Sequence, residues 1–398
     1  MTVASPSTDF SASQLEAALE LHRSALVVDA HADTAQRLAD EAWSLADLPG
    51  YGMLSLESAR KGGLHAATFA AWVEPHLHAG RFADRAFDLI DAVRTEAHRH
   101  RQALRLCRTP REVQAARAEG LFAMLLSVEG GHAIENSLDT LRAFHDLGVR
   151  SLTLTWSNST DWADSCGDLD NPAIPHHGGL TRFGREVIAE MNRLGMMVDV
   201  SHVSDATLAD VLACTTAPII ASHSSARALT DTPRNLTDAQ LRAIAANGGI
   251  VCVNFYAGFI SAEWRATWNP LRPELEAAHA AMERERAAKG ARVTYAHQHA
   301  IDAAFAARLP RPPLSALIDH IEHVARVAGP DHVGLGSDFD GIPQLPEGID
   351  TAADLPKITA ALLARGFTPG DLTKLLGANL LRVMGEAQAA ARPRKSDS

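Results

Sequence analysis

The sequence predicts a (β/α)8 TIM-like barrel with additional helices. Three observations support this fold class: eight short apolar runs, helical segments between them, and polar side chains where the runs end. Short runs without strict alternation are typical of parallel strands buried on both faces. Eight strand–helix units in series predict closure into a barrel with its active site at the C-terminal ends of the strands. The runs are Leu26–Asp29, Ala66–Val73, Leu121–Val128, Val149–Thr155, Met196–Val200, Ala217–Ala221, Ile250–Phe255 and His332–Leu335.

Two other architectures fit the sequence less well. A doubly wound open sheet would have a similar order of strands and helices, but no GxGxxG motif follows the first run. A solenoid would show a repeat of roughly 20–50 residues, and none is visible. The chain has 398 residues. It is therefore long enough for a barrel, which takes about 250 residues or more with insertions.

The chain is predicted to form one domain with a short segment at each end. Residues 1–14 are polar and are expected to be flexible, residues 15–386 form the barrel domain, and residues 387–398 are predicted to be a disordered tail. Within the domain, residues 259–307 are charged and rich in alanine, which predicts a helical insertion on the C-terminal face. Arg81–Leu106 has apolar residues at helical spacing and predicts one long surface helix.

The composition excludes several classes of partner. A net charge of −11 disfavours nucleic acid and an anionic membrane surface. No run reaches the roughly 18 apolar residues of a transmembrane helix, and no apolar core of a signal peptide is present. The four cysteines form no CxxC pair, which is typical of a reduced, cytoplasmic protein. We therefore expect a cytoplasmic protein without a nucleic-acid or membrane partner.

Polar side chains follow the apolar runs where parallel strands would end. His31 and Asp33 are two residues apart, so they point the same way at the end of a buried strand. A charge there is costly unless it is paired or binds a metal, and imidazole and carboxylate are good zinc ligands. Four further side chains of these types end later runs: Glu129, His202, His223 and Asp338.

This set predicts a site for two divalent cations. Carboxylates packed together without a cation would repel one another. Five ligands exceed the roughly three that a catalytic zinc takes from the protein, whereas a carboxylate shared by two ions about 3.5–4 Å apart accommodates them. Each residue alone could instead anchor a loop, and Glu129 could cap the following helix. The prediction therefore depends on the joint pattern.

Seven segments occur in order along the chain: VVDAHADT, SVEGGH, LTLTWSNSTDWADS, VDVSHVSD, ASHSSAR, PRNLTD and VGLGSDFDG. Together they resemble the renal (membrane) dipeptidase family of zinc peptidases, in its bacterial form. The resemblance runs from about Leu26 to Met384, nearly the whole chain. It implies a (β/α)8 barrel that hydrolyses dipeptides at a binuclear zinc site. Members of the family often form homodimers, so the resemblance also favours a homodimer.

By motif match, the resemblance implies two zinc ions per chain. His31 and Asp33 would bind one zinc, His202 and His223 would bind the other, and Glu129 would bridge them. Two metal ions lower the pKa of a bridging water, so that hydroxide is available near neutral pH to attack the peptide carbonyl.

Three further residues receive roles by the same match. Arg234 in PRNLTD matches the arginine that holds the substrate's carboxylate, and Tyr256 in VNFY resembles the tyrosine beside it. Asp338 in SDFDG matches the acid that takes the water's proton and passes it to the leaving amine. From the residues alone, Arg234 could form a surface ion pair, Tyr256 could be a core residue, and Asp338 could pair with a buried arginine.

Trp156 departs from the family pattern, because many members have a histidine after LTLT that stabilises the oxyanion. An indole N–H replaces imidazole only in part, and Asn158 is a candidate substitute donor. Trp156 keeps open an alternative function, an amidohydrolase-type barrel acting on an N-acyl amino acid, a cyclic amide or a lactone. A third hypothesis, an inactive barrel that serves as a binding protein, is disfavoured because all five expected ligands and Asp338 are present.

Overall fold

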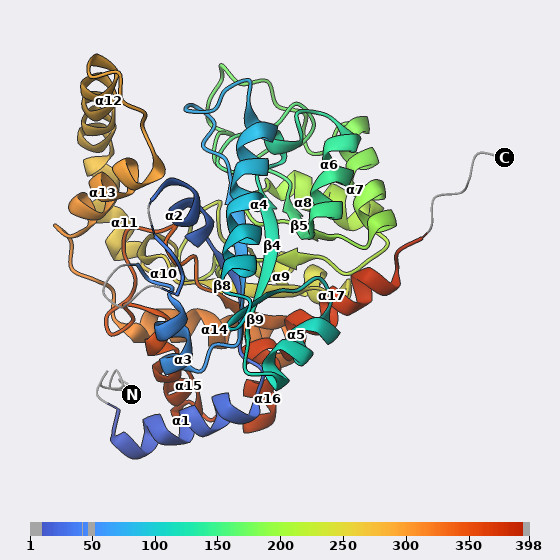
Figure 1. Ribbon diagram of the computed structural model, residues 1–398, viewed down its shortest axis with the longest axis vertical. Helices are drawn as coiled ribbons and strands as arrows, with labels where there is room; N and C mark the ends of the chain where they lie inside the picture. The colour runs from blue at the N-terminus through green and yellow to red at the C-terminus, as the bar shows by residue number, and fades with distance from the viewer. Residues whose placement is uncertain (1–9, 42, 47–51, 393–398) are drawn as a thin grey trace.

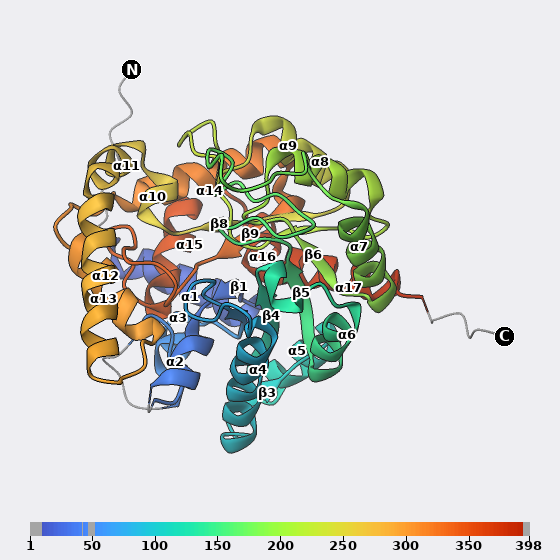
Figure 2. The same ribbon diagram turned by 90° about the horizontal axis from the view of Figure 1, so that it is seen from above.

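Eight parallel strands form a near-closed barrel at the centre of the molecule, as the apolar runs predict (Figures 1 and 2). The computed structural model describes residues 10–41, 43–46 and 52–392. The strand order is β1-β2-β4-β5-β6-β7-β8-β9. The barrel strands are β1 (Val28–Ala32), β2 (Ala66–Trp72), β4 (Phe122–Glu129), β5 (Val149–Thr153), β6 (Met197–Asp199), β7 (Ile220–Ala221), β8 (Ile250–Asn254) and β9 (Val333–Gly336).

The barrel closes between its first and last strands, at their C-terminal ends. An isolated parallel bridge joins Ala32 to Phe339. The Asp33 N–H donates to the Phe339 carbonyl at 2.8 Å, and the Asp338 N–H donates to the His31 carbonyl at 3.0 Å. This closing seam therefore places the first and last of the predicted site segments side by side.

A ninth strand lies outside the barrel path and corrects one prediction. The sequence predicts a single helix over Arg81–Leu106, but α4 spans Phe82–Arg99 and β3 (Leu104–Leu106) then pairs in parallel with β4. The reason lies in β4, because β5 pairs only with its second half, from Leu126 onward. The backbone groups at Phe122–Met124 need a partner on that edge, and β3 supplies it.

Helices surround the barrel, and predicted caps bound several of them. Thr237 is the N-cap of α9 and its hydroxyl accepts from the Gln240 N–H, while Gly195, at a φ of 70°, ends α7. The surrounding helices are α1 (Ala12–Ser24), α2 (Thr34–Asp40), α3 (Leu56–Gly62), α5 (Pro110–Ala118), α6 (Leu138–Leu147), α7 (Arg182–Leu194), α8 (Asp205–Cys214), α9 (Asp238–Ala246), α14 (Leu314–Ala328), α15 (Leu355–Ala364), α16 (Pro369–Thr373) and α17 (Asn379–Ala389). Short 3-10 or π turns are η1 (Gly131–Ile134), η2 (Asn269–Leu271), η3 (Pro330–His332), η4 (Ala352–Asp354) and η5 (Lys374–Ala378).

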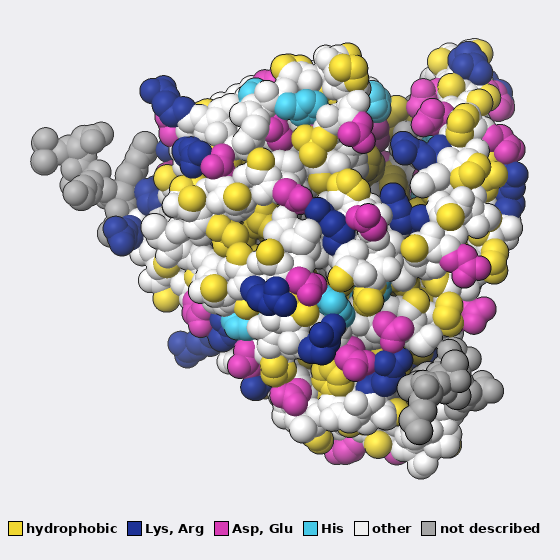
Figure 3. Space-filling model, turned by 180° about the vertical axis from the view of Figure 1, so that it is seen from behind, with side chains coloured by type: hydrophobic (Ala, Val, Ile, Leu, Met, Phe, Trp, Pro, Cys, Tyr) yellow, Lys and Arg dark blue, Asp and Glu magenta, His cyan; other side chains and the backbone are white. Residues whose placement is uncertain are grey.

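The segment predicted as an insertion, residues 259–307, is helical. Its helices group on one side of the barrel, and α12 stands out from the body (Figures 1 and 2). Seen from behind, the same part projects beside a hollow in the surface (Figure 3). The group comprises α10 (Ala257–Ile260), α11 (Ala262–Trp268), α12 (Arg272–Ala288) and α13 (Tyr295–Ala306).

The two ends of the domain differ slightly from the predicted bounds. Helix α1 begins at Ala12, inside the segment predicted to be flexible, and residues 1–9 lie outside the described residues. Helix α17 reaches Ala389 with Ala387 fully buried, so it extends past the predicted start of the tail at 387. Residues 393–398 lie outside the described range. In the described part of the chain, every helix is too short or too polar to cross a bilayer.

Candidate active site

Five buried side chains meet at the C-terminal end of the barrel. His31 belongs to β1, Asp33 precedes α2, Glu129 ends β4, His202 follows β6 and His223 follows β7. Their exposed fractions lie between 1% and 8%. The apolar strands are buried along their length, so the polar residues that end them face the mouth of the barrel. The structure thus brings together all five residues that the sequence predicts as metal ligands.

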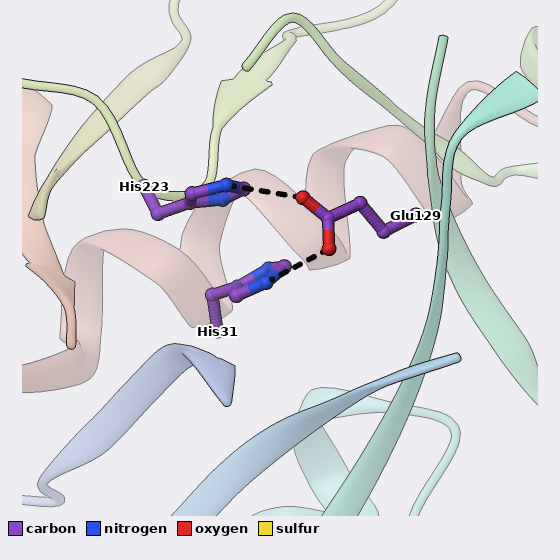
Figure 4. A group of neighbouring side chains, drawn as sticks. All are labelled: His31, Glu129 and His223. Atoms are coloured by element: carbon purple, nitrogen blue, oxygen red, sulfur yellow. Dashed lines mark ion pairs between the residues drawn. The ribbon is translucent and has the colours of Figure 1, made fainter. Parts of the chain in front are cut away.

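Glu129 lies between His31 on one side and the pair His202 and His223 on the other. Its Oε1 is 2.9 Å from Nε2 of His202 and 3.2 Å from Nε2 of His223. Its Oε2 is 3.4 Å from Nε2 of His31, which lies 3.5 Å from Oδ2 of Asp33. Figure 4 shows His31 and His223 pointing toward different oxygens of the same carboxylate. Oε1 therefore faces two imidazole nitrogens and Oε2 faces a third.

The donor set fits metal ions. His31 Nε2 and Asp33 Oδ1 are buried without a hydrogen-bond partner among the described residues. Ligand atoms of His31, Glu129 and His223 lie within 4.8 Å of one another, as do those of His31, Asp33 and Asp338. Buried polar atoms without partners are costly, and a bound cation would satisfy them.

Burial and neighbouring charges act differently on the pKa values of these groups. Burial alone would lower the pKa of His31, but the carboxylates of Glu129 and Asp33 raise it well above its usual value. Burial also raises the pKa of Asp33 well above its usual value. Burial would raise the pKa of Glu129 too, but the charge of His31 and the surrounding imidazoles hold it well below that range. A cation that binds here would therefore displace protons from His31 and Asp33.

A buried hydrogen-bond chain determines the tautomer of His223. Ser222 Oγ lies 2.5 Å from Asp199 Oδ2 and 2.7 Å from His223 Nδ1. The other oxygen of Asp199 accepts from the N–H groups of Ser201 and Ser222 at 3.0 Å each. Because a carboxylate only accepts, the Ser222 hydroxyl donates to Asp199 and accepts from Nδ1–H of His223. The free lone pair is then on Nε2, which is the form that a metal ligand needs.

Asp29 supports the opposite side of the site in a similar way. It accepts from the Ser337 hydroxyl and, at 2.9 Å, from the Ser337 N–H, and the His31 N–H is 3.3 Å from the same carboxylate oxygen. Burial raises the pKa of Asp29 to about 6. Sequence reasoning missed the corresponding Asp199. An aspartate inside the apolar run of VDVSH was the signal that could have found it.

Asp338 is held in a strained backbone conformation beside the predicted metal ligands. Its φ is 63°, in the left-handed region that residues other than glycine rarely adopt, and His202 has a φ of 70°. Asn254 Nδ2 donates to Asp338 Oδ2 at 2.8 Å, and Asp338 Oδ1 lies 4.0 Å from His31 Nε2. Asp338 is therefore held by hydrogen bonds rather than by a buried arginine, and it also lines the pocket.

Arg234 is buried beside His223, one of the predicted metal ligands, and is not a surface ion pair. Its side chain donates to Ser224 Oγ at 2.8 Å and to the His223 carbonyl at 2.9 Å. Among the described residues no carboxylate lies within ion-pair distance of it, and its Nε–H is buried without a partner. Burial lowers the pKa of Arg234, although nearby acids oppose this. A guanidinium has five N–H donors, so several remain for a ligand.

A cavity of about 330 Å3 opens over Asp33, Glu129, His202, His223 and Asp338, and both the barrel and the insertion line it, whereas His31 and Arg234 are not among its lining residues. Tyr256 and Trp156, two of the residues predicted to contact substrate, line this cavity, and their contact with substrate stays a prediction. Asn158 is not among the lining residues, and its Nδ2 is 3.4 Å from the Ser159 carbonyl. A donor role for Asn158 stays a prediction. Six lining residues carry no motif that could have found them from the sequence: Trp72, Glu74, His279, Tyr295, Gln298 and Asp302.

Comparisons of the sequence with known proteins identify its family. The sequence model of the family described as Membrane dipeptidase (Peptidase family M19) matches residues 15–398. Dipeptidase verJ from Clonostachys rogersoniana is 33% identical over 347 residues, which cover 85% of this chain and 76% of that protein. Dipeptidase 3 from Macaca fascicularis is 30% identical over 354 residues, which cover 87% of this chain but only 61% of that protein.

Solved structures show the same fold. The probable dipeptidase PvdM from Pseudomonas aeruginosa has a TM-score of 0.79 and 25% identity, with 96% of this chain and all of that chain covered. A metallo peptidase from Rhodobacter sphaeroides, liganded with a phosphinate mimic of the dipeptide L-Ala-D-Ala, has a TM-score of 0.72 and 27% identity over 91% of this chain and 99% of its own. The family match covers nearly the whole sequence, so this chain belongs to the membrane dipeptidase family, peptidase family M19.

Proposed function

We propose that the protein is a zinc-dependent dipeptidase with two metal ions in its active site. One observation carries the proposal: Glu129 presents one oxygen to His31 and the other to His202 and His223, at the base of a pocket. Family membership supports peptide-bond hydrolysis. The dipeptide mimic bound by the Rhodobacter sphaeroides relative supports a dipeptide as substrate.

His31 and Asp33 would hold one ion, His202 and His223 would hold the second, and Glu129 would lie between them. Imidazole and carboxylate ligands suit zinc. When bound, two such ions supply a hydroxide near neutral pH and polarise the scissile carbonyl.

Arg234 would bind the C-terminal carboxylate of the substrate. It already donates to Ser224 and to the His223 carbonyl, which orient the guanidinium beside the metal centre. Its unused donors can make charge-assisted hydrogen bonds to a carboxylate. A binding group this close to the centre would favour short substrates with a free C-terminus.

Asp338 would move the proton during hydrolysis. Its Oδ2 is occupied by Asn254, while its Oδ1 faces the metal ligands. It would accept a proton from the attacking water and then donate it to the leaving amine, acting first as a base and then as an acid.

Trp156 supports a second candidate, hydrolysis of an N-acyl amino acid, a cyclic amide or a lactone. Its ring packs against Trp72 with centroids 4.8 Å apart, so a bulky indole occupies the wall where many relatives would place a histidine donor. The same metal centre could serve either reaction.

A metal assay and a substrate panel test the proposal. We expect roughly two zinc ions per chain. We also expect hydrolysis of L,L- or L,D-dipeptides, with Asp338→Asn abolishing turnover while zinc remains bound. A protein that binds no metal would refute both proposed hydrolase functions. Hydrolysis of N-acyl amino acids or lactones, but not of dipeptides, would favour the second candidate. Unchanged turnover in Asp338→Asn would refute the role of Asp338 in proton transfer.

A further inference from the structure

Two acidic residues of the pocket are not used by the metal centre. Glu74 lies just beyond β2, and Asp302 lies on α13. The described lining of the pocket contains neither lysine nor arginine. Its five carboxylates are Asp33, Glu74, Glu129, Asp302 and Asp338. Three of these have roles at the metal centre, so the negative charge of Glu74 and Asp302 has no assigned counterpart.

Glu74 has a defined position and, in the described part of the chain, no lysine or arginine partner. Its carboxylate accepts a hydrogen bond from the Leu77 N–H, which ties it to the turn after β2. Within the described ranges, no lysine or arginine forms an ion pair with it. Burial raises the pKa of Glu74, although the Leu77 N–H and the nearby His76 oppose this.

Asp302 has only a histidine as its ion-pair partner in the described structure. Its Oδ1 lies 2.9 Å from Nε2 of His279, which comes from α12. Burial raises the pKa of Asp302, although the hydrogen bond to His279 opposes this. The insertion therefore adds a second acidic group to the pocket without adding an arginine or lysine.

An aromatic wall adjoins these acids. The rings of Trp72 and Trp156 have centroids 4.8 Å apart, and those of Trp72 and Tyr295 have centroids 5.7 Å apart. All three residues line the pocket together with Glu74 and Asp302. Aromatic faces attract cations, and their surfaces also accommodate the aliphatic stem of a long side chain.

The topology indicates which end of a dipeptide meets this wall. In the strand order, β2 and β7 are separated by three strands in either direction, so their ends lie on opposite sides of the barrel mouth. Arg234, bound to Ser224 and His223 after β7, would hold the C-terminal carboxylate. The N-terminal residue would then extend toward β2, where Trp72 and Glu74 lie.

We propose that the pocket selects dipeptides whose N-terminal residue carries a cationic side chain of the lysine or arginine class. This inference rests on the proposed dipeptidase function. The side chain would lie along Trp72, Trp156 and Tyr295 and place its charge beside Glu74, with Asp302 adding to the negative field. The cavity of about 330 Å3 is within the usual range for small-molecule sites, about 300–1,000 Å3.

The test compares two substrates that differ in charge but hardly in shape, L-arginyl-glycine and L-citrullyl-glycine. With zinc-loaded protein, we expect kcat/KM to be roughly tenfold higher for the arginyl substrate, as one partly desolvated charge contact can provide. Glu74→Gln should lower this ratio several-fold, and Asp302→Asn should lower it as well. Asp91→Asn, an exposed change on α4, is the matched control and should keep the wild-type ratio.

The possible results distinguish a failure of the cationic preference from a failure of the dipeptidase function. A ratio near one in the wild type overturns the inference while leaving the dipeptidase function intact. A wild-type ratio that persists in folded, zinc-loaded Glu74→Gln and Asp302→Asn overturns the assignment of these acids. If neither substrate is hydrolysed, and L-alanyl-L-alanine and L-alanyl-D-alanine are not hydrolysed either, the proposed function itself fails, and this inference fails with it.

Discussion

Asn254 Nδ2 donates a hydrogen bond to Asp338 Oδ2 at 2.8 Å, and both side chains are buried. The same amide accepts from the Tyr256 N–H at 2.6 Å, so its orientation is determined by the backbone of its own strand end. The last residue of β8 thereby leaves Asp338 Oδ1 as the oxygen that faces His31.

Replacing Asn254 should therefore impair turnover more than substrate binding. In Asn254→Ala, Asp338 loses the donor that orients it, and we expect kcat to fall roughly 10- to 100-fold, as for other residues that orient an active-site group. KM and zinc content should change little, and steady-state kinetics with metal analysis measure all three. Asn171→Ala, an exposed change, serves as the control. An unchanged kcat would contradict the role.

The Ser222 hydroxyl should strengthen metal binding. In Ser222→Ala, His223 loses the acceptor of its Nδ1–H and the link to Asp199. Zinc affinity should then fall roughly 10- to 100-fold in a competition assay with a chelator. Ser127→Ala is the matched control, since the Ser127 hydroxyl is buried without a partner among the described residues. Equal zinc affinities in Ser222→Ala and Ser127→Ala would show that the hydrogen bonds from His223 through Ser222 to Asp199 do not support metal binding.

Gly341 leaves space for two carboxylates of the site. A Cβ atom at this position would overlap Asp33 Oδ2 and lie 2.6 Å from Asp338 Oδ1. Gly341→Ala should therefore displace both carboxylates and lower zinc affinity at least tenfold, as loss of a ligand's support does. Gly385→Ala on α17 is the control, because the nearest atom to its Cβ is Pro110 Cγ at 3.6 Å. Titration calorimetry with zinc distinguishes the variants, and wild-type affinity in Gly341→Ala would show that the carboxylates can move.

Acid should destabilise the fold in part through His320. Its side chain is 1% exposed, and its Nδ1 accepts from the Ala226 N–H at 3.0 Å. Burial and the neighbouring His323 lower the pKa of His320 from 6.5 to about 4. Because the folded-state pKa is the lower one, the neutral ring contributes its full stability above pH 6.5, and that contribution is lost as the pH falls from 6.5 toward 4.

The expected loss is about 3 kcal/mol, since each pH unit between the two pKa values contributes about 1.4 kcal/mol. His320→Gln keeps an acceptor that does not titrate. Its free energy of unfolding, measured with denaturant at several pH values, should therefore fall less with acid than that of the wild type. Parallel pH profiles for the two proteins would show that His320 is not responsible.

The sequence by itself determined the barrel and the candidates for its metal centre. A parallel strand buried on both faces needs a continuous apolar run, and runs such as Phe122–Glu129 and Ile250–Asn254 show it locally. The ligands end such runs, so His31 and Glu129 could be recognised without knowing which strands are neighbours. The apolar run and the polar residue that ends it lie within a few consecutive residues, so both can be recognised from the sequence alone.

Tertiary structure alone decided how these groups are supported and what surrounds them. Asn254 and Asp338 are 84 positions apart in the sequence. Asp302 comes from the insertion and Glu74 follows the end of β2, and no common motif links these two residues of the pocket. The β3 strand pairs with the part of the β4 edge that β5 leaves without a partner. Such contacts depend on which distant segments the closed barrel packs together, and that packing leaves no periodic signal in the chain.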